Sequence, residues 1–263
     1  MTTEPHHAVV PDPAPRPHAV PPDLTIVVPC FDEAHRLGPT LDRIRAWIGG
    51  RDEAVDVLVV DDGSTDATAA VARRALAGAD HRVLTHPRNR GKGAALRTGM
   101  TAATGALVLF TDADLSTPIE AAGRFLAAHR AGHAVVIGSR KTAGARVTRR
   151  QHPVRETMGK VYSSLSRGLI CPGVTDFTCG FKSFTREAAH AIFGRLREDG
   201  WAYDTELLYV ARRLGYDVLE IPVPWANDPS TRVSLLRDAF GSAAGLARIR
   251  WRALRGVYGA GSP

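Results

Sequence analysis

The order of apolar and polar residues along the chain predicts an alternation of strands and helices. Two short runs, at residues 24–28 and 55–60, are nearly continuous in apolar residues and rich in β-branched ones. Such runs are typical of strands that are buried on both faces of a parallel sheet. Between them, Leu37, Leu41 and Ile44 recur at the spacing of one helix face. We therefore expect a strand, a helix and a second parallel strand, which is the repeating unit of an α/β sheet.

This alternation continues to about residue 138 and then becomes less regular. Repeated strand and helix units with right-handed crossovers form a doubly wound sheet, so the predicted fold class is α/β with a mostly parallel central sheet. The expected strands are 24–28, 55–60, 82–84, 106–111, 134–138 and 217–223, the expected helices are 34–48, 66–76, 94–103, 118–130, 155–169, 204–214 and 233–255, and 174–185 is a mixed segment.

Length and composition favour one folded domain between two less ordered ends. The 263 residues are 44% hydrophobic, enough for the core of one α/β domain, which we expect at 23–256. Residues 1–22 hold seven prolines and no apolar run, which predicts a disordered leader and not a signal peptide. Residues 257–263 are expected to form a flexible tail. No segment approaches the roughly 18 uninterrupted apolar residues of a membrane span, so we expect a soluble or surface-attached protein.

The three cysteines favour a reducing compartment. Cys30, Cys171 and Cys179 cannot all pair within one chain, and their spacing is not that of zinc ligands. We expect them to be small buried groups in a cytoplasmic protein. Peripheral attachment at the inner face of the cell membrane is compatible with this expectation.

The formal net charge of +7 is concentrated in two segments. Residues 140–155 carry six basic side chains and no acid, and residues 232–255 carry six arginines against Asp238. Such blocks suit phosphate-bearing partners or an anionic membrane, at about 1 kcal/mol per basic residue near the lipid. They also occur as solvated faces that only keep a protein soluble, so charge alone leaves both possibilities open.

The last expected helix has two possible roles. Arg248, Arg252 and Arg255 fall on one of its faces, with Trp251 and Leu254 nearby. This pattern favours contact with an anionic membrane surface. It fits equally well a helix that packs on the domain and leaves an arginine edge in solvent.

Two carboxylates follow the expected strand 106–111, with one alanine between them. Side chains of a strand alternate in direction, so Asp112 and Asp114 point the same way if the extended geometry continues past Phe110. Carboxylate oxygens suit Mg²⁺ or Mn²⁺ that also binds a diphosphate. An Asp-rich turn without a metal is the alternative for an isolated pair of this kind.

Polar residues also follow the other early strands. The first leads through Pro29 to Glu33 at a helix start, where a carboxylate can also act as a simple cap. The second ends in Asp61 and Asp62, which can accept hydrogen bonds from a nucleobase and ribose hydroxyls. The third is followed by Lys92 between two glycines at a helix start, an anion site that suits a diphosphate. Because these strand ends meet at one edge of a doubly wound sheet, they predict a nucleotide-diphosphate site with a metal.

These motifs, in this order, resemble those of family 2 glycosyltransferases over roughly residues 24–255. Within that family the chain is most similar to the dolichyl- and polyprenyl-phosphate glucosyltransferases. The motifs shared with the family are Val28-Pro29-x-Phe31-Asp32-Glu33, Val60-Asp61-Asp62-Gly63-Ser64-x-Asp66, Asn89-x-Gly91-Lys92-Gly93 and Asp112-Ala113-Asp114, and those shared with the narrower group are Gly138-Ser139-Arg140, Cys179-Gly180-Phe181-Lys182, Gly200-Trp201-x-x-Asp204-x-Glu206 and Ile221-Pro222-Val223-x-Trp225.

The resemblance implies a single GT-A-like domain with a donor half at about 23–140 and an acceptor half at about 141–256. It also implies a divalent cation, Mg²⁺ or Mn²⁺, and a role for each motif residue. Pro29, Glu33, Asp61 and Asp62 would hold the nucleoside, Lys92 would meet the diphosphate, Asp112 and Asp114 would bind the metal at the donor, and Arg140, Arg155 and Lys182 would bind the acceptor.

The expected reaction is inverting, metal-dependent transfer of a hexose from a nucleoside-diphosphate sugar to a polyprenyl or dolichyl phosphate. Glucose and UDP are favoured. The metal and Lys92 would stabilise the leaving diphosphate, and both Lys92 and Asp114 are therefore candidate catalytic residues. A phosphate acceptor is already anionic at neutral pH, since its second pKa is near ~6, and needs positioning but no base. A hydroxyl acceptor needs a base, for which Asp204 is the best candidate; Asp204 also suits holding donor hydroxyls or capping a helix.

Other functions share some of these features. A family 2 enzyme with a soluble or glycan hydroxyl acceptor would have the same donor motifs. A sugar nucleotidyltransferase would also use an α/β sheet and a metal, but would consume a nucleoside triphosphate. Nucleic-acid binding is supported by the positive charge alone, because aromatic residues do not cluster in the basic segments. We therefore expect no nucleic-acid partner.

Overall fold

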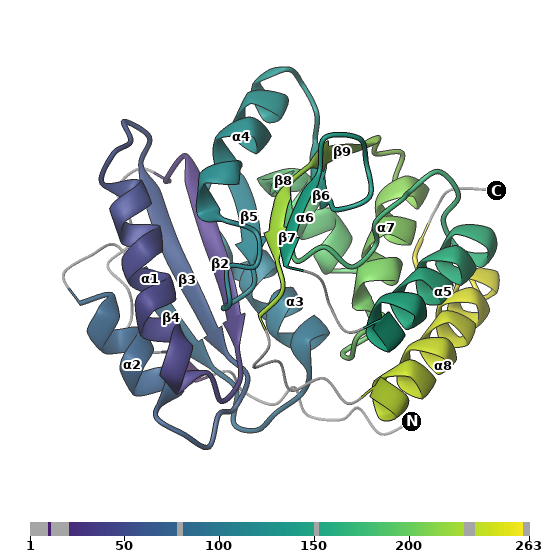
Figure 1. Cartoon of the computed structure of the whole chain (residues 1–263), viewed down its shortest axis with the longest axis horizontal. Helices are drawn as coiled ribbons and strands as arrows, with labels where there is room; N and C mark the ends of the chain where they lie inside the picture. The colour runs from purple at the N-terminus through teal and green to yellow at the C-terminus, as the bar shows by residue number, and fades with distance from the viewer. Residues whose placement is uncertain (1–9, 12–20, 78–80, 150–152, 229–234, 260–263) are drawn as a thin grey trace.

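The computed structural model describes residues 10–11, 21–77, 81–149, 153–228 and 235–259 (Figure 1). The described strands are β1 (Val10–Pro11), β2 (Leu24–Cys30), β3 (Val55–Asp61), β4 (His81–Thr85), β5 (Leu107–Thr111), β6 (Val135–Ser139), β7 (Arg146–Arg149), β8 (Phe181–Thr185), β9 (Val218–Pro222) and β10 (Pro224–Ala226). The described helices are α1 (Ala34–Ile48), α2 (Thr68–Ala75), α3 (Lys92–Ala102), the 3₁₀ turn η1 (Ile119–Ala121), α4 (Ala122–Arg130), α5 (Pro153–Leu169), α6 (Arg186–Phe193), α7 (Tyr203–Arg213) and α8 (Leu235–Leu254).

Eight of these strands form one sheet in the order β1-β4-β3-β2-β5-β8-β6-β9. Strands β4, β3, β2 and β5 are parallel neighbours, and β6 is parallel to β9. Strand β8 runs antiparallel between β5 and β6, and β1 runs antiparallel along β4. The prediction of an α/β fold with a mostly parallel sheet is therefore confirmed. Strand β8 lies within the segment predicted to be mixed, 174–185, and α6 follows directly after it; neither element was predicted.

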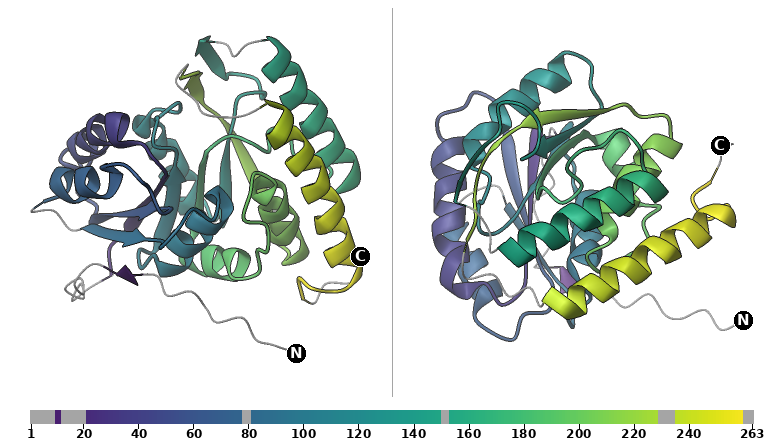
Figure 2. Two further views of the ribbon diagram at one scale, coloured as in Figure 1. Left: turned by 90° about the horizontal axis from the view of Figure 1, so that it is seen from below. Right: turned by 45° about the vertical axis from the view of Figure 1, so that its right-hand side comes forward.

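Alternation along the central strands creates two separate apolar layers. On β2, Ile26 and Val28 join a cluster with residues of α1, α2 and α4, whereas Val27 joins a cluster with residues of α3, α6 and α7. All three side chains are fully buried. Helices therefore cover both faces of the sheet (Figures 1 and 2), as the continuous apolar strands predicted.

A small second sheet was not predicted from the sequence. Strands β7 and β10 pair in parallel, with Val147 opposite Trp225. Strand β7 is short and its four residues are all exposed, so it lacks the alternation that reveals a half-buried strand. It lies within the basic segment and leads toward α5.

The ends of the chain differ in part from the prediction. Most of the proposed leader, residues 1–22, lies outside the described residues, but Val10 and Pro11 form β1. Tyr258, assigned to a flexible tail, is buried instead. Its ring packs on Tyr209 and its hydroxyl donates to Glu206 at 2.6 Å. The folded domain therefore continues past residue 256.

The three cysteines agree with the expectation from composition. Cys30, Cys171 and Cys179 are free and buried, as predicted. Among the residues that the structure describes, none of the helices has the length and apolar character needed to cross a bilayer. Helices α5 and α8 lie side by side at one end of the molecule (Figure 2).

Candidate functional site

A cavity of about 1110 Å³ opens where β2, β3 and β5 end. The structure thus brings together polar residues that are far apart in the chain, because parallel strands present their carboxyl ends at one edge. The predicted site residues that line this cavity are Pro29, Glu33, Asp62, Lys92, Asp112, Asp114, Arg140 and Asp204. Asp61 and Lys182 are not among its lining residues, and the side chain of Arg155 lies outside the described part of the structure.

Lys92 and Asp112 form the central ion pair of the cavity. Lys92 Nζ lies 2.5 Å from Asp112 Oδ1. Burial alone would lower the pKa of the Lys92 ammonium, but the carboxylates of Asp112 and Asp204 outweigh it and raise that pKa. Lys92 is therefore a fixed positive charge at the first turn of α3, where the positive end of the helix dipole also favours an anion.

Asp112 and Asp114 face the same cavity, but a turn rather than a strand orients them. Strand β5 ends at Thr111, and the backbone N–H of Leu115 donates to the carbonyl of Asp112 at 3.1 Å. Leu115 has a positive φ of 44°, which closes this turn. The two carboxylates are thus brought together without the extended geometry that the sequence analysis assumed.

The donor set at this turn suits a divalent cation that is shared with a ligand. Burial, and then the neighbouring charge of Asp112, raise the pKa of Asp114, as expected for a partly buried carboxylate beside a second one. Within the described residues there is no group of three or more His, Cys, Asp or Glu side chains that could hold a metal. Mg²⁺ or Mn²⁺ at Asp112 and Asp114 would take its remaining ligands from phosphate and water, as Mg²⁺ commonly does.

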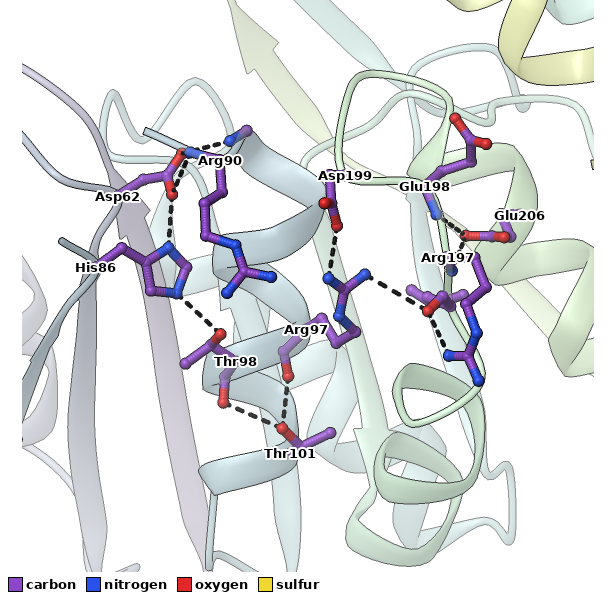
Figure 3. A network of polar contacts seen from close by, with 12 residues as sticks. Asp62, His86, Arg90, Arg97, Thr98, Thr101, Arg197, Glu198, Asp199 and Glu206 are labelled. Atoms are coloured by element: carbon purple, nitrogen blue, oxygen red, sulfur yellow. Dashed lines mark hydrogen bonds and ion pairs between the residues drawn. The ribbon is translucent and has the colours of Figure 1, made fainter. Parts of the chain in front are cut away.

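Asp62 holds the loop that carries Lys92. Its carboxylate accepts the backbone N–H of Gly91 at 2.6 Å and that of Arg90 at 3.1 Å (Figure 3). His86 Nδ1 lies 2.6 Å from the same carboxylate. The sequence predicted that Asp62 accepts hydrogen bonds from a nucleoside; in this structure protein donors supply hydrogen bonds to it, and Asp62 shapes the loop before Lys92.

Asp61 and Glu33 also have protein partners. Asp61 is 1% exposed and accepts the backbone N–H of Ser64 at 3.1 Å, so it stabilises the turn after β3. Glu33 lies 2.6 Å from Nε of Arg36 in the first turn of α1. The structure thus places Glu33 at the cavity wall as part of an ion pair and Asp61 behind it.

Arg140 follows β6 at the wall of the cavity and is fixed by Asp176. Its Nε and Nη2 each donate to the Asp176 carboxylate at 2.7 Å, and Nη2 also donates to Thr178 at 2.8 Å. Burial would raise the pKa of Asp176, but the guanidinium of Arg140 dominates and lowers it to about 2. The guanidinium also lies 5.2 Å from the ring centroid of Trp225. The arginine is therefore held rigidly beside the cavity.

Lys182 does not reach the cavity wall. It is fully buried, and its Nζ donates to Asp204 at 2.5 Å and to the carbonyl of Cys179 at 2.6 Å. The structure therefore gives this lysine the position of a counter-ion beneath Asp204 and not that of an acceptor ligand. Burial is the largest influence on Asp204 and raises its pKa, although Lys182 and Lys92 oppose the shift.

Gly180 contacts a site residue, although its motif predicted no role for it. A Cβ atom at this position would overlap the carboxylate of Asp112, so only glycine lets the chain pass behind that side chain. His86 and Asp176 were also missed as partners of Asp62 and Arg140. The glycine in Cys179-Gly180-Phe181-Lys182 was the available signal, whereas the pairing of His86 with Asp62 depends on the packing of β4 beside β3.

A second wall of the cavity is apolar. It includes Met158, Val161 and Leu165 from α5 and Leu246 from α8. Trp201, which is 43% exposed, also lines the cavity, and Lys92 Nζ lies 5.8 Å from its ring centroid. One cavity therefore joins a charged region at the sheet edge to an apolar region between two helices.

Sequence comparison finds similar proteins that cover most of this chain. The chain is 34% identical over 212 residues to a dolichyl-phosphate beta-glucosyltransferase of Trichomonas vaginalis, covering 76% of this chain and 63% of the relative, which is less than two thirds of its length. It is 32% identical over 249 residues to the dolichyl-phosphate beta-glucosyltransferase of Homo sapiens, covering 89% of this chain and 77% of that protein.

A solved structure supports the assignment of the fold. Glucosyl-3-phosphoglycerate synthase from Mycobacterium tuberculosis, crystallised with Mn²⁺, uridine diphosphate and glucosyl-3-phosphoglycerate, matches with a TM-score of 0.63 at 22% identity, covering 88% of this chain and 80% of that one. At this identity the likeness shows the GT-A-like fold alone. The model of the family described as "Glycosyl transferase family 2" matches residues 25–193. The chain therefore belongs to glycosyl transferase family 2, as its strand-end motifs predicted.

Proposed function

We propose that this protein transfers a hexose from a nucleoside-diphosphate sugar to a polyprenyl or dolichyl phosphate. The observation that carries the proposal is the single cavity in which the Lys92, Asp112 and Asp114 side chains face an apolar wall from α5 and α8. The charged region suits a sugar diphosphate, and the apolar region suits a prenyl chain. Glucose is the favoured sugar because two similar proteins are named dolichyl-phosphate beta-glucosyltransferases. UDP is the favoured nucleotide.

The donor would lie over the ends of β2, β3 and β5. Pro29 and Glu33 line the cavity and would adjoin the nucleoside, while Lys92 at the start of α3 would face the diphosphate. Asp112 and Asp114 would hold Mg²⁺ or Mn²⁺, which when bound would neutralise charge on the leaving diphosphate. Lys92 supplies the same kind of stabilisation from the protein, and its effect grows as negative charge develops in the transition state.

The acceptor would bring its phosphate to the basic side of the cavity. Arg140 and Lys141 line that side, and Arg155 belongs to the same basic segment. A phosphate monoester is already charged at neutral pH because its second pKa is near ~6. One of its oxygens attacks the anomeric carbon as the bond to the diphosphate breaks. This single displacement inverts the anomeric configuration and converts an α-linked donor into a β-linked product.

Asp204 would position the donor sugar in this reaction. Its carboxylate lines the cavity and is paired with the buried Lys182, so no proton transfer is required of it when the acceptor is a phosphate. A hydroxyl acceptor is the second candidate, and it is favoured by the raised pKa of Asp204. With that acceptor, Asp204 would act as a general base.

Product analysis separates these candidates. Purified protein with Mn²⁺ is offered a panel of UDP- and GDP-sugars together with either a short polyprenyl phosphate or soluble hydroxyl and phosphorylated acceptors, and products are identified by mass spectrometry. The proposal expects a prenyl-phosphate hexose and free nucleoside diphosphate. Transfer to hydroxyl acceptors alone would select the second candidate. Consumption of a nucleoside triphosphate with release of pyrophosphate would instead identify a nucleotidyltransferase.

The proposed substrates indicate where in the cell the protein acts. A nucleoside-diphosphate sugar is a water-soluble donor, whereas a long polyprenyl phosphate lies in a bilayer. We therefore infer a cytoplasmic protein that binds peripherally to the inner face of the cell membrane, without a nucleic-acid partner. The sequence suggested that arginines of the C-terminal helix contact the membrane. Two of them, Arg248 and Arg252, instead pair with the buried Glu198, which weakens that suggestion.

A further inference from the structure

Helix α5 turns a polar face inward. Tyr162, Ser163 and Ser166 lie on its inner side, where the two serines are buried and the tyrosine is half-buried. The hydroxyl groups of Tyr162 and Ser166 lie 2.8 and 3.1 Å from the Thr205 hydroxyl of α7, and Ser163 accepts a hydrogen bond from Lys141 at 2.7 Å. Hydroxyl groups on this face therefore connect the helix to Thr205 and Lys141.

The outward face of the same helix is apolar. Val154, Val161, Leu165 and Leu169 are 51%, 55%, 44% and 58% exposed, and Met158 lies on the same stripe. A helix on the surface of a globular protein normally directs its apolar stripe to the core and its polar face to water. In α5 this arrangement is inverted, and large apolar patches of this kind mark interaction surfaces.

The surroundings of this apolar face are strongly basic. Residues 140–170 contain eight basic residues and one acidic residue, a net charge of +7 that equals the formal net charge of the whole chain. Arg146 and Arg149 of β7 and Lys160 and Arg167 of α5 are exposed. An apolar helix face flanked by arginine and lysine is the pattern of helices that lie in the interface of an anionic bilayer.

The charge distribution favours a bilayer over a second copy of this chain. Symmetric pairing through α5 would bring two segments of net charge +7 together, and like charges across an interface are unfavourable. An anionic lipid surface provides the complementary charge. Moreover, Met158, Val161 and Leu165 line the cavity as well as the helix face, so a bilayer on this face would meet the cavity mouth.

We propose that the outward face of α5, defined by Val154, Met158, Val161, Leu165 and Leu169, docks on an anionic membrane surface. This inference rests on the proposed function, since a prenyl phosphate could then pass from the bilayer into the cavity while its phosphate reaches Arg140. It also replaces the C-terminal helix α8 as the principal membrane contact. Two of the arginines expected to face lipid from α8 are instead bound to Glu198.

The test compares two double variants of the full chain in sedimentation with vesicles of equal parts phosphatidylglycerol and phosphatidylcholine. Val154 and Leu169 are exposed on α5 outside the cavity wall, and V154D/L169D places two charges on the docking face. W251D/L254D makes the matched change on α8, where both side chains are exposed. We expect V154D/L169D to lower vesicle affinity by roughly tenfold or more and W251D/L254D to change it much less.

Several results would overturn the docking surface. Vesicle affinity that falls equally in both variants, or in W251D/L254D alone, would do so. Vesicle binding of V154D/L169D as strong as that of the unaltered chain, or no vesicle binding by the unaltered chain, would also do so. Binding that is equally strong to vesicles of phosphatidylcholine alone would remove the charge argument. A dimer that V154D/L169D dissociates, measured by light scattering, would identify a second copy as the occupant of this face.

A separate assay keeps this inference apart from the proposed function. With a short, water-soluble prenyl phosphate and no vesicles, V154D/L169D should retain the transfer rate of the unaltered chain and its melting temperature. Vesicle binding without transfer to any prenyl phosphate would refute the proposed function and leave the docking surface in place. Transfer to the soluble prenyl phosphate without vesicle binding would refute the docking surface and leave the proposed function in place.

Discussion

His86 Nδ1 and Asp62 Oδ1 lie 2.6 Å apart, and both side chains are buried (Figure 3). Because a carboxylate only accepts hydrogen bonds, the ring nitrogen is the donor. The other ring nitrogen, Nε2, lies 2.9 Å from Thr98 Oγ1 on α3. Asp62 in turn accepts the N–H of Gly91. A chain of contacts thus connects the end of β4 to the loop that positions Lys92.

This relationship predicts that His86→Ala weakens donor binding. A hydrogen bond to a charged group contributes about 1.5–3 kcal/mol, so we expect KM for the nucleotide sugar to rise by roughly tenfold or more while KM for the acceptor changes little. His129→Ala is the matched control, because His129 also makes two hydrogen bonds but contacts Ser183 and the carbonyl of His133. Equal increases in both KM values would argue against a role confined to the donor side.

The contact between Gly180 and Asp112 predicts an effect of a single methyl group. In Gly180→Ala the new Cβ atom would displace the Asp112 carboxylate, and overpacking of this kind costs about 1–3 kcal/mol. We expect lower affinity for Mn²⁺ in the presence of UDP, measured by calorimetry, and a correspondingly lower kcat. Gly123→Ala in α4 is the control, since a Cβ there meets nothing within 4 Å. Unchanged Mn²⁺ affinity in Gly180→Ala would exclude this positioning role.

Much of the fold could be predicted because hydrophobic periodicity is a local signal. The strands β2, β3 and β5 are buried on both faces, so their apolar residues are continuous in the sequence. The exposed strand β7 has no such pattern and was missed. Tyr258 was misassigned for a related reason: its burial depends on Tyr209 and Glu206, which are distant in the sequence.

The location of the site followed from the sequence, but the partners of its residues did not. Parallel strands bring Asp62, Lys92 and Asp112 to one edge whatever their side chains bind. Whether a carboxylate faces a ligand or a protein group depends on tertiary packing. Asp61 and Lys182 illustrate the limit, since both belong to recognisable motifs but lie behind the cavity wall, where Ser64 and Asp204 are their partners.

Removal of Asp114 tests the proposed metal site. Asp114→Ala should lower metal-dependent transfer by about a hundredfold or more, because one of the two carboxylates that suit the cation is lost. The melting temperature should stay the same within a few degrees, because the Asp114 side chain lines the cavity and does not belong to the hydrophobic core. Asp217→Ala, at an exposed aspartate, is the control. Full turnover at unchanged Mn²⁺ concentration would remove the metal role of Asp114.

The pair of Lys182 and Asp204 predicts a stability defect that a second substitution repairs. Lys182→Met leaves the Asp204 carboxylate buried without its nearest cation, and breaking such a pair costs about 3–5 kcal/mol. The double variant Lys182→Met/Asp204→Leu removes both charges, so its free energy of unfolding in urea should recover most of that loss. Transfer activity should not recover, because the carboxylate proposed to position the sugar is absent. Recovery of activity would show that Asp204 is dispensable for the reaction.

Asp176 predicts how stability depends on pH. An aspartate in an unfolded chain has a pKa of about 3.9, whereas Arg140 lowers the pKa of Asp176 to about 2 in the folded protein despite burial. A lowered folded-state pKa stabilises the protein above the unfolded value, and this contribution disappears as pH falls from about 4 toward about 2. The shift corresponds to about 2–3 kcal/mol at neutral pH.

Urea unfolding of the unaltered chain and of Asp176→Asn at a series of pH values measures this contribution. We expect the difference in unfolding free energy to be about 2 kcal/mol or more near pH 7, because the variant also leaves Arg140 without its carboxylate partner. The difference in unfolding free energy should become smaller below about pH 4, because Asp176 binds a proton in the unfolded chain there but is still ionised in the folded protein. Asp217→Asn, at an exposed position, should show no such narrowing. A difference for Asp176→Asn that stays constant down to about pH 2 would mean that the Arg140 pair does not lower the pKa of Asp176.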